Sequence, residues 1–521
     1  VWDDPERCAL ATVGNRLYVA YCYGTTSKGV LKGLANDAPY EARWFDPRDG
    51  AYAGAPLTVR ATGGEWVVPE KPDDDDWILV VGMCGSIGTR KFGGSVSLRA
   101  GGPASVRAGG LEEEKGMNGT RLGALAAVVL AAGCVMMEKG FGARGNGDKV
   151  TVACYYFGQY HPNDPRNLKE RGGPWSEWEL VKAARPRFPG HAQPKVPLWG
   201  YEDESDPRVM AKKIDAAADH GIDAFIFDWY YYEDGPFLDR TVNEGFLKAK
   251  NNRRLKFALM WANHDWMKNL FPYTKGDPRV VRYPGRVSPA GFDRIGDHVI
   301  KDYFKHPSYW RIDGKPYFSF YDLGKLVESF GSVPATRAGL DVFRAKAVAA
   351  GLPGLHLNAV SWGQPILPGE TVPADPAKLV RDLGFDSVTS YVWIHHALMP
   401  QPQTDYDAVR DAYLRYWNKA AKMFDVPYFP NVSMGWDSSP RCDQRQALDN
   451  SGYPFTNVIV GNTPERFEAA LRLTKERLLA DPNGPRILTI NCWNEWTEGS
   501  YLEPDTVNGM RYLEAVKRVF R

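Results

Sequence analysis

Short runs of β-branched and aromatic residues alternate with longer amphipathic segments from about residue 150 to the end of the chain. The short runs predict strands, at residues 150–156, 224–228, 256–261, 316–321, 355–360, 387–391, 427–431 and 486–491. The amphipathic segments predict helices, among them 206–220, 337–350, 405–424 and 464–480. Eight such alternations predict an α/β fold, a (β/α)8 TIM barrel over residues 150–521. A doubly wound open sheet is the alternative, but its first turn would carry a glycine-rich phosphate loop, which is missing from this sequence.

The first 110 residues follow a different pattern, in which short apolar or alternating runs are separated by turn-forming pairs. The runs cover 16–21, 41–45, 65–68 and 77–81, with Asp-Pro, Asp-Gly and Gly-Gly pairs between them. This spacing predicts a small all-β sandwich, an accessory domain of residues 1–110 that precedes the barrel. The acidic run 73–76 lacks the alternating ligand spacing of a calcium loop, so we expect a solvated turn there.

Residues 111–149 are predicted to be a linker that contains a signal-like segment, 117–134. Its apolar stretch has about twelve residues, too few for a bilayer, which needs roughly twenty. A basic residue before the stretch and small residues at its end resemble a bacterial lipoprotein signal, in which Cys134 would be lipidated. We therefore expect an exported protein of the bacterial cell envelope, periplasmic or on the surface, that meets the membrane only through this lipid.

The internal position of this segment needs an explanation, because a signal peptide begins a polypeptide. The simplest is that two reading frames are joined here, so that residues 1–116 belong to a different polypeptide. A buried helix between domains is the alternative. The glycine pattern at 140–145 neither follows a predicted strand nor opens a helix, so we assign it to the linker.

Charge and composition narrow the range of partners. Lys and Arg total 64 against 63 Asp and Glu, a net charge of +1, so we expect no nucleic-acid partner. The 17 Trp and 26 Tyr suit a protein that stacks aromatic rings on the flat faces of sugars. The seven cysteines are scattered and predict neither a disulfide framework nor a zinc site. We expect no metal and no cofactor, and the oligomeric state is left open.

Aromatic, amide and charged residues gather where the predicted strands end, which is where such barrels carry their chemistry. They predict an open cleft that binds carbohydrate, with apolar rings against sugar faces and polar groups on hydroxyls. The predicted substrate-binding residues are Tyr155, Tyr156, Gln159, His161, Asp228, Trp229, Trp261, Asn263, His264, Asp265, Tyr391, Trp393, Trp436, Asp437, Arg441, Trp493, Asn494 and Trp496.

Glu495 and Glu498 are the predicted catalytic residues. A spacing of three places both carboxylates on one side of a helical turn, with Cβ atoms about 5–6 Å apart. A retaining glycosidase needs two carboxyl groups roughly 5–5.5 Å apart, and an inverting one needs more room. Close like charges also raise one pKa, so that one carboxyl group can stay protonated as a general acid.

Residues from about 150 to 521 resemble the WbsX-like family, also called glycoside hydrolase family 99-like. The resemblance rests on residues 155–156, 159–162, 175–178, 187–191, 193–194, 206–207, 221–225, 261–263, 436–437, 493–499 and 501–504. Family 99 proper, a more distant relative, contains endo-α-mannosidases and endo-α-mannanases. Residues 40–52 and 76–81 resemble the C-terminal β-sandwich of apiosidase-like glycoside hydrolases.

The family resemblance implies a role for each glutamate. Glu495 would deprotonate the sugar 2-hydroxyl, giving a 1,2-anhydro intermediate and net retention, and Glu498 would protonate the leaving oxygen and then activate water. The carboxylate pair by itself fits an ordinary double displacement equally well. Relatives usually carry a glutamate at the position of His264 and an asparagine at that of Asp265, which leaves the identity of the sugar open.

Three functions compete. The first is a glycoside hydrolase that cleaves an α-linked, mannan-like polysaccharide or oligosaccharide with retention. The second is a glycosyltransferase of surface-polysaccharide synthesis, although the strand ends carry no diphosphate-binding helix start or Asp-x-Asp motif, and nucleotide sugars are cytoplasmic. The third is a non-catalytic carbohydrate-binding protein, which would need the aromatic residues but not two close carboxylates.

Overall fold

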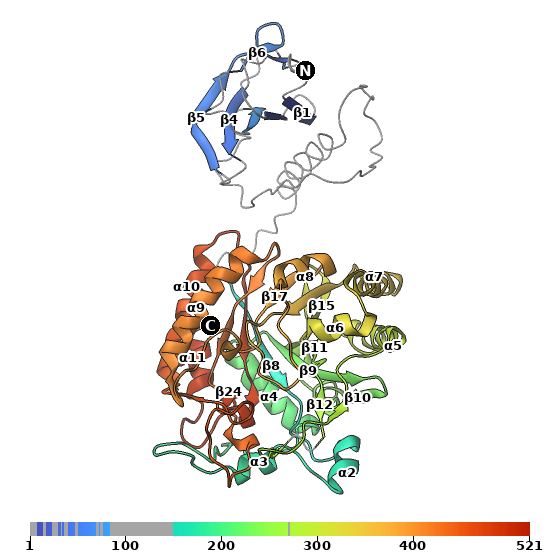
Figure 1. Cartoon of the computed structure of the whole chain (residues 1–521), viewed down its shortest axis with the longest axis vertical. Helices are drawn as coiled ribbons and strands as arrows, with labels where there is room; N and C mark the ends of the chain where they lie inside the picture. The colour runs from blue at the N-terminus through green and yellow to red at the C-terminus, as the bar shows by residue number, and fades with distance from the viewer. Residues whose placement is uncertain are drawn as a thin grey trace. The chain divides into compact units, whose positions relative to one another are not determined.

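The computed structural model describes residues 8–13, 17–22, 30–32, 34–35, 40–46, 51–68, 72, 77–83, 149–268 and 271–521. The chain divides into two compact units, Val1–Gly145 and Asn146–Arg521 (Figure 1). The segment 117–134 with Cys134, the acidic run 73–76 and the glycine pattern 140–145 lie outside the described residues. Among the described residues, none of the helices is both long and apolar enough to cross a membrane.

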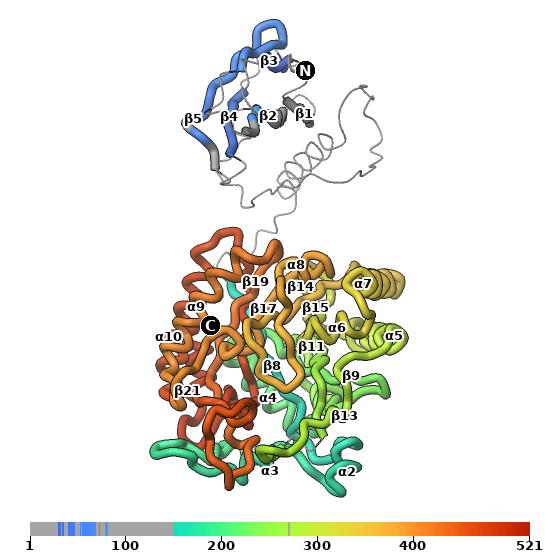
Figure 2. Tube along the Cα trace, in the orientation of Figure 1, coloured from blue at the N-terminus to red at the C-terminus, as the bar shows by residue number. Residues whose placement is uncertain are grey.

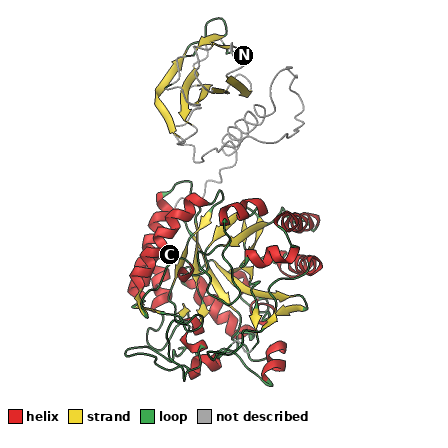
Figure 3. Cartoon of the chain, viewed as in Figure 1, coloured by secondary structure: helices red, strands yellow, loops and turns green. Residues whose placement is uncertain are grey.

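The second unit is a closed barrel of parallel strands surrounded by helices (Figures 2 and 3). Its strands, in order around the sheet, are β8 (Thr151–Phe157), β9 (Ala224–Tyr232), β11 (Lys256–Trp261), β15 (Lys315–Phe320), β16 (His356–Val360), β17 (Ser387–Thr389), β19 (Tyr428–Phe429), β20 (Asn431–Ser433) and β22 (Ile487–Asn491). From β8 to β19 each strand pairs in parallel with the next, and β20 pairs with β22, which returns to β8. The predicted α/β fold and TIM barrel are confirmed.

The seventh strand of the barrel is divided into two short pieces. β19 pairs with β17 on one side, and β20 pairs with β22 on the other. Pro430 separates the pieces, and proline has no backbone N–H to donate to a ladder. Its carbonyl still accepts the backbone N–H of Thr489 at 2.9 Å. The two pieces therefore act as one strand and close the ring between the sixth and eighth strands.

The helices of the barrel unit are α2 (Pro165–Arg171), α3 (Trp178–Ala183), α4 (Pro207–Asp219), α5 (Pro289–Val299), α6 (Leu323–Phe330), α7 (Val333–Ala349), α8 (Pro376–Leu383), α9 (Tyr406–Met423), α10 (Pro464–Ala480) and α11 (Arg511–Phe520). Several begin with a capping side chain followed by proline, a start that the sequence makes visible. Asp206 caps α4 in this way by accepting the backbone N–H of Arg208 at 2.8 Å. α7 begins four residues before its predicted start because Ser332 caps it there, with Pro334 in its first turn.

Shorter elements complete the loops of the barrel unit. The single-turn helices are η2 (Thr241–Phe246), η3 (Asn252–Arg254), η4 (Ile300–Phe304), η5 (Trp393–His395), η6 (Ser439–Arg441) and η7 (Trp496–Glu498). The short strands are β10 (Gly235–Phe237), β12 (Trp266–Met267), β13 (Val281–Tyr283), β14 (Arg311–Ile312), β18 (Gln403–Asp405), β21 (Val458–Val460), β23 (Asn494–Glu495) and β24 (Ser500–Tyr501). Of these, η6, β23 and η7 carry Arg441, Glu495 and Glu498 of the site described below.

The described residues of the first unit form β-strands and turns, in agreement with the predicted all-β domain. An antiparallel sheet has the order β1 (Cys8–Val13), β2 (Leu17–Cys22), β7 (Trp77–Met83), β4 (Tyr40–Asp46) and β5 (Ala51–Val59). A second pair joins β3 (Val30–Lys32) to β6 (Glu65–Val67). Leu31 of the pair packs in one apolar cluster with Ala42 and Leu79 of the larger sheet. The two sheets thus enclose a small core of their own.

Candidate active site

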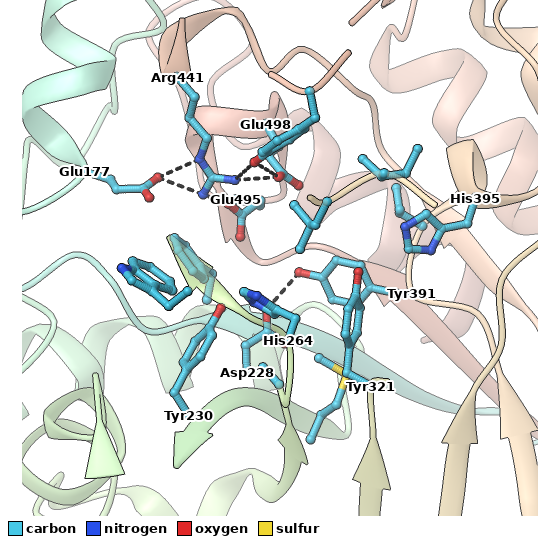
Figure 4. A pocket seen from close by; sticks show the side chains of 18 of the residues that line it. Glu177, Asp228, Tyr230, His264, Tyr321, Tyr391, His395, Arg441, Glu495 and Glu498 are labelled. Carbon is cyan, nitrogen blue, oxygen red and sulfur yellow. Dashed lines mark hydrogen bonds and ion pairs between the residues drawn. The ribbon is translucent and has the colours of Figure 1, made fainter. Parts of the chain in front are cut away.

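A pocket lies at the carboxyl ends of the barrel strands (Figure 4). It contains about 600 Å³ of empty space, part of it continuous with solvent. The side chains that line it are Phe157, Glu177, Asp228, Tyr230, Met260, Ala262, His264, Trp266, Phe271, Tyr321, Ile366, Leu367, Tyr391, Val392, His395, Trp436, Arg441, Tyr453, Glu495 and Glu498. Aromatic rings and carboxyl groups therefore share one pocket at the end of the barrel that carries chemistry in this fold.

Glu495 and Glu498 lie on one side of the tight turn that follows β22. Glu495 ends β23, and Glu498 ends the one-turn helix η7. A 3-10 helix has three residues per turn, so positions three apart face the same direction. Both carboxylates line the pocket and both bind Arg441, so the structure brings the predicted pair together.

Arg441 is the cation around which the carboxyl groups gather. Its Nη2 donates to Oε1 of Glu495 at 2.6 Å, and its Nη1 donates to Oε1 of Glu498 at 2.5 Å. Its Nε and Nη2 donate to Oε2 of Glu177 at 3.1 and 2.8 Å. The hydroxyl of Tyr453 accepts from Nη1 at 2.6 Å and donates to Glu498 at 2.8 Å. One guanidinium thus orients three buried carboxyl groups.

Burial changes the acidity of the glutamate pair. It raises the pKa of Glu495 well above the usual range, and the nearby Glu498 adds to the rise while Arg441 opposes it. Burial also raises the pKa of Glu498, against the lowering effect of Arg441 and of the hydrogen bond from Tyr453. A carboxyl group that keeps its proton near neutral pH is suited to general acid catalysis.

Asp228 forms a second polar centre of the pocket, across from Arg441 in Figure 4. Its Oδ2 accepts the hydroxyl proton of Tyr391 at 2.8 Å. Its Oδ1 is buried and has no hydrogen-bond partner among the described residues. Burial raises the pKa of Asp228 well above its ordinary value. A polar substrate group in the pocket would supply the missing partner, since buried polar atoms are rarely left unpaired.

Two histidines in the pocket wall are neutral rather than cationic. Burial lowers the pKa of His264 to about 4 and that of His395 to about 3. Nδ1 of His264 contacts the backbone oxygen of Asp265 at 3.2 Å, and Nδ1 of His395 has no partner among the described residues. A neutral imidazole has one nitrogen that donates and one that accepts, a combination that suits sugar hydroxyls.

Three predicted aromatic residues face away from the pocket because successive side chains of a strand point to opposite faces. Trp229 follows the pocket residue Asp228 and contacts Tyr303 in the helix layer, with ring centroids 6.3 Å apart. Trp261 packs on Phe292 of α5 at 5.9 Å. Tyr156 likewise lies on the helix side of β8, below Lys213 of α4. These three rings, which were predicted to bind substrate, therefore pack between the barrel and the helices and are not among the residues that line the pocket.

Trp493, Asn494 and Trp496 are buried behind the turn and do not line the pocket. The indole N–H groups of Trp493 and Trp496 donate to the two carboxylate oxygens of Glu503 at 2.9 and 2.8 Å. The amide of Asn494 donates to Glu204 at 2.9 Å. A buried indole N–H needs an acceptor, and an internal carboxylate supplies it here. These three residues hold the turn instead of contacting a sugar from the pocket wall.

The remaining predicted residues outside the pocket are Tyr155, Gln159, His161, Asn263, Asp265, Trp393 and Asp437. The side-chain polar atoms of Tyr155, Gln159 and His161 are buried without a hydrogen-bond partner among the described residues, whereas the other four residues bind neighbouring loops and strands. Asn263 exchanges two hydrogen bonds with the backbone of Asp322, at 2.7 and 2.8 Å. Asp437 accepts hydrogen bonds from His191 and Gln193, both at 2.7 Å. A polar side chain at a strand end can bind either a neighbouring loop or a substrate. The sequence does not reveal which of these two partners it binds.

Of the residues predicted from sequence, the pocket contains Asp228, His264, Tyr391, Trp436, Arg441, Glu495 and Glu498. The prediction missed Glu177, Tyr230 and Tyr453, among others. The two-residue period of β9 would have selected Tyr230 together with Asp228. Glu177 lies in the Trp-Ser-Glu-Trp run 175–178 of the first loop, one of the segments that carry the family resemblance, and its carboxylate is the signal that could have found it. Tyr453 lies in a long loop after η6, where no periodicity marks it.

The described part of the chain contains no group of three or more His, Cys, Asp or Glu side chains placed to hold a metal ion. The cysteines near the barrel strands, Cys154, Cys442 and Cys492, are buried free thiols. Burial raises the pKa of Cys492 well above its ordinary value, with the charge of Glu495 adding to the rise, so this thiol stays protonated.

The fold and the site together define a (β/α)8-barrel protein with a buried carboxylate pocket. Residues 152–516 match the family model described as glycosyltransferase WbsX. That match spans more than half of the chain, so the protein belongs to this family. Residues 3–82 match a second model, described as "Putative collagen-binding domain of a collagenase".

Curated relatives and solved structures were also found. The chain is 27% identical over 389 residues to the protein described as uncharacterized protein WxcX, in two strains of Xanthomonas campestris pv. campestris. The matched region is 71% of this chain and 49% of each relative, so the chain spans about half the length of the curated relatives it matches.

Among solved structures, the GH99 endo-alpha-mannosidase from Bacteroides thetaiotaomicron has 14% identity and a TM-score of 0.40, over 72% of this chain and 96% of that one. A protein described as "Glycoside hydrolase-like protein" has 15% identity and a TM-score of 0.47, over 74% and 99% of the two chains. The family assignment rests on the sequence match alone.

Proposed function

We propose that the pocket hydrolyses an α-linked, mannan-like polysaccharide or oligosaccharide with net retention of the anomeric configuration. The observation that carries the proposal is the meeting of Glu495 and Glu498 at one guanidinium inside the pocket. Retaining glycosidases use two close carboxyl groups, one of which must hold a proton. Burial raises the pKa of both glutamates and supports such a proton.

In the proposed reaction, Glu498 protonates the glycosidic oxygen as the bond to C1 breaks. Glu495, as a base, removes the proton of the 2-hydroxyl, and O2 closes on C1 to form a 1,2-anhydro sugar. Glu498, now ionised, takes a proton from water, which opens this ring at C1 while Glu495 returns its proton to O2. The alternative is a double displacement in which Glu495 attacks C1 directly. A substrate without the 2-hydroxyl separates the two routes, because only the second can use it.

The test replaces each glutamate by glutamine and follows hydrolysis of a panel of polysaccharides, with the product anomer observed by NMR. We expect Glu498→Gln and Glu495→Gln each to lower kcat by about 10³-fold or more, because general acid and base catalysis contribute that much. Oligosaccharide binding, measured by calorimetry, should persist. Glu476→Gln, an exposed glutamate of α10, is the control. Unchanged turnover in both pocket variants would contradict the proposal.

A glycosyltransferase of surface-polysaccharide synthesis is the second candidate, because the matched family model carries that description. A transferase of the same pocket would deliver the activated sugar to a hydroxyl of a second glycan instead of water. A nucleotide-sugar donor fits less well, since Arg441 is the only Arg or Lys among the lining residues and its nitrogens already bind carboxylates. Products of the same assay with an added acceptor glycan distinguish transfer from hydrolysis, and binding without either reaction would indicate a lectin.

We also propose that the reaction takes place in the bacterial cell envelope, with Cys134 as a lipid attachment point. The support is the lipoprotein-like segment 117–134 of the sequence. An extracytoplasmic location favours hydrolysis over transfer from nucleotide sugars, which are made in the cytoplasm.

A further inference from the structure

Glu177 is a third carboxyl group of the glutamate cluster, contributed from far away in the sequence. It immediately precedes α3, in the loop between the first barrel strand and α4, and it is fully buried. In Figure 4 it lies on the far side of Arg441 from Glu498. Glu177 lines the pocket, and its Oε1 is buried without a hydrogen-bond partner among the described residues.

Three donors converge on the other oxygen of Glu177. Nη2 and Nε of Arg441 donate to Oε2 at 2.8 and 3.1 Å. The hydroxyl of Thr497, which lies between Glu495 and Glu498 in the turn, donates to the same oxygen. Glu177 therefore takes two of the N–H groups of Arg441 and, in its ionised form, cancels its charge.

The charge balance of the cluster follows from this arrangement. One guanidinium faces three buried carboxyl groups. If Glu177 neutralises Arg441, every negative charge on the glutamate pair is left without a compensating cation in a buried site, which is unfavourable. Without Glu177, the charge of Arg441 would be available to hold one or both members of the pair ionised.

We propose that Glu177 is a positioning residue that occupies Arg441 and thereby makes the Glu495–Glu498 pair retain a proton at neutral pH. Glu177 acts through Arg441. This inference rests on the proposed hydrolysis, in which the retained proton is the one that the general acid donates. The other titratable groups that face the pair are not substituted in the test below. They are Tyr160, Asp228, Tyr230, His264, Tyr321, Tyr391, Tyr453 and Cys492.

The test replaces Glu177 by glutamine, which keeps the size and an acceptor oxygen but removes the charge. We expect both limbs of the kcat/KM profile to move to lower pH by about one unit or more, because the freed charge of Arg441 stabilises both carboxylates. Activity should fall at least about tenfold at pH 8, and most of it should return at pH 5. Glu179→Gln removes an exposed charge from the same helix and should leave the profile in place.

A merely structural role for Glu177 would lower kcat at every pH and leave the limbs unmoved, and that result would overturn the proposal. So would a profile identical to that of the unchanged protein. If Glu177→Gln does not fold, Glu177→Asp withdraws the charge by one methylene group and should move the limbs in the same direction by less.

A second readout does not depend on turnover. The infrared band of protonated carboxyl groups, recorded in D2O at pH 7, should shrink in Glu498→Gln or Glu495→Gln relative to the unchanged protein, and also in Glu177→Gln. Absence of hydrolysis with this band pattern would defeat the proposed function but support the role of Glu177. A band that Glu177→Gln leaves at full strength would defeat the role of Glu177 itself.

Discussion

Asp228 shows how a single buried acid is arranged when a pocket has to receive a polar ligand. One of its oxygens accepts the hydroxyl of Tyr391, and the other has no partner among the described residues. Burial raises its pKa well above the ordinary value, so the folded protein keeps a proton that the unfolded chain gives up near pH 4. A buried acid of this kind lowers the free energy of unfolding, and such a loss is common where a side chain serves a functional site.

Asp228→Asn should therefore stabilise the protein in a pH-dependent way. A raised folded pKa contributes stability that is complete below the unfolded pKa and is lost as the pH rises toward the folded value. Asparagine carries no such charge, so calorimetry should find a Tm above that of the unchanged protein at pH 8 and a smaller difference at pH 4. One kcal/mol corresponds to roughly 2–4 °C in a domain of about 150–250 residues, and to less in this larger unit.

Asp437→Asn provides the contrast with opposite sign. Although burial acts to raise it, hydrogen bonds from His191 and other neighbours lower the pKa of Asp437 to about 2. Its stabilising effect is present above the unfolded pKa and is lost as the pH falls toward 2, so Asp437→Asn should lower the Tm at neutral pH.

For Asp228→Asn, a Tm difference from the unchanged protein that stays the same at every pH would contradict the account given for that residue.

At the scale of the element, β9 divides its side chains between two environments. Asp228 and Tyr230 line the pocket, while Trp229 between them packs into the helix layer. Both faces of a parallel barrel strand are buried, so its hydrophobicity does not reveal which face meets the pocket. The alternation of the strand does, once one pocket residue is known.

This division predicts different effects for two neighbouring substitutions. Trp229→Ala removes a buried ring and should cost about 3–5 kcal/mol of unfolding free energy, measured with denaturant. Tyr230→Phe removes only a hydroxyl that faces the pocket. It should weaken glycan binding or turnover by roughly tenfold, with unfolding changed by less than about 1 kcal/mol. A larger loss of stability in Tyr230→Phe than in Trp229→Ala would show that the two faces are assigned the wrong way round.

At the scale of the whole molecule, a buried ion cluster joins the first part of the barrel to the last. Lys213 of α4 binds Glu204 and Glu503, each at 2.5 Å, and its side chain is 1% exposed. The two glutamates in turn hold Trp493, Asn494 and Trp496 around the turn that carries Glu495 and Glu498. This buried ion cluster thus holds the loop that follows the eighth strand in place.

Removal of this lysine should be severe. Lys213→Met leaves two buried carboxyl groups without their cation, and breaking a buried ion pair in this way costs about 3–5 kcal/mol. Arg208→Ala is the matched control on the same helix, because its ion pair with Asp206 has a side chain that is 90% exposed and should contribute little. Denaturant unfolding of the two variants measures both effects, and equal losses would argue against the role of the cluster.

Local patterns carried the sequence prediction where the determining interactions are local. Strand ranges such as 256–261 coincide with the observed element, and α10 spans the predicted 464–480. Periodicity, caps and prolines decide these elements within a few residues. The glutamate pair was visible for the same reason, since Glu495 and Glu498 share one turn.

The contents of the pocket followed from longer-range contacts. Glu177 and Tyr453 bind Arg441 from separate loops, and no sequence pattern in either loop predicts these contacts. The tryptophans after the last barrel strand are predicted from the sequence to bind substrate. In the structure the indole N–H groups of Trp493 and Trp496 instead donate hydrogen bonds to a carboxylate that lies on neither that strand nor the turn after it. Residue type alone does not distinguish a ring that stacks on a sugar from one that fills a core.

The order of strands and helices, the barrel class and the two glutamates one turn apart can be predicted from the sequence, because these depend on neighbours in the chain. Which strand-end side chains face the pocket, and which guanidinium binds the acids, follows from the tertiary fold. Those outcomes depend on the inward or outward face of each strand and on loops that meet across hundreds of residues. Burial then sets the charge of each group, and burial is a property of the folded chain.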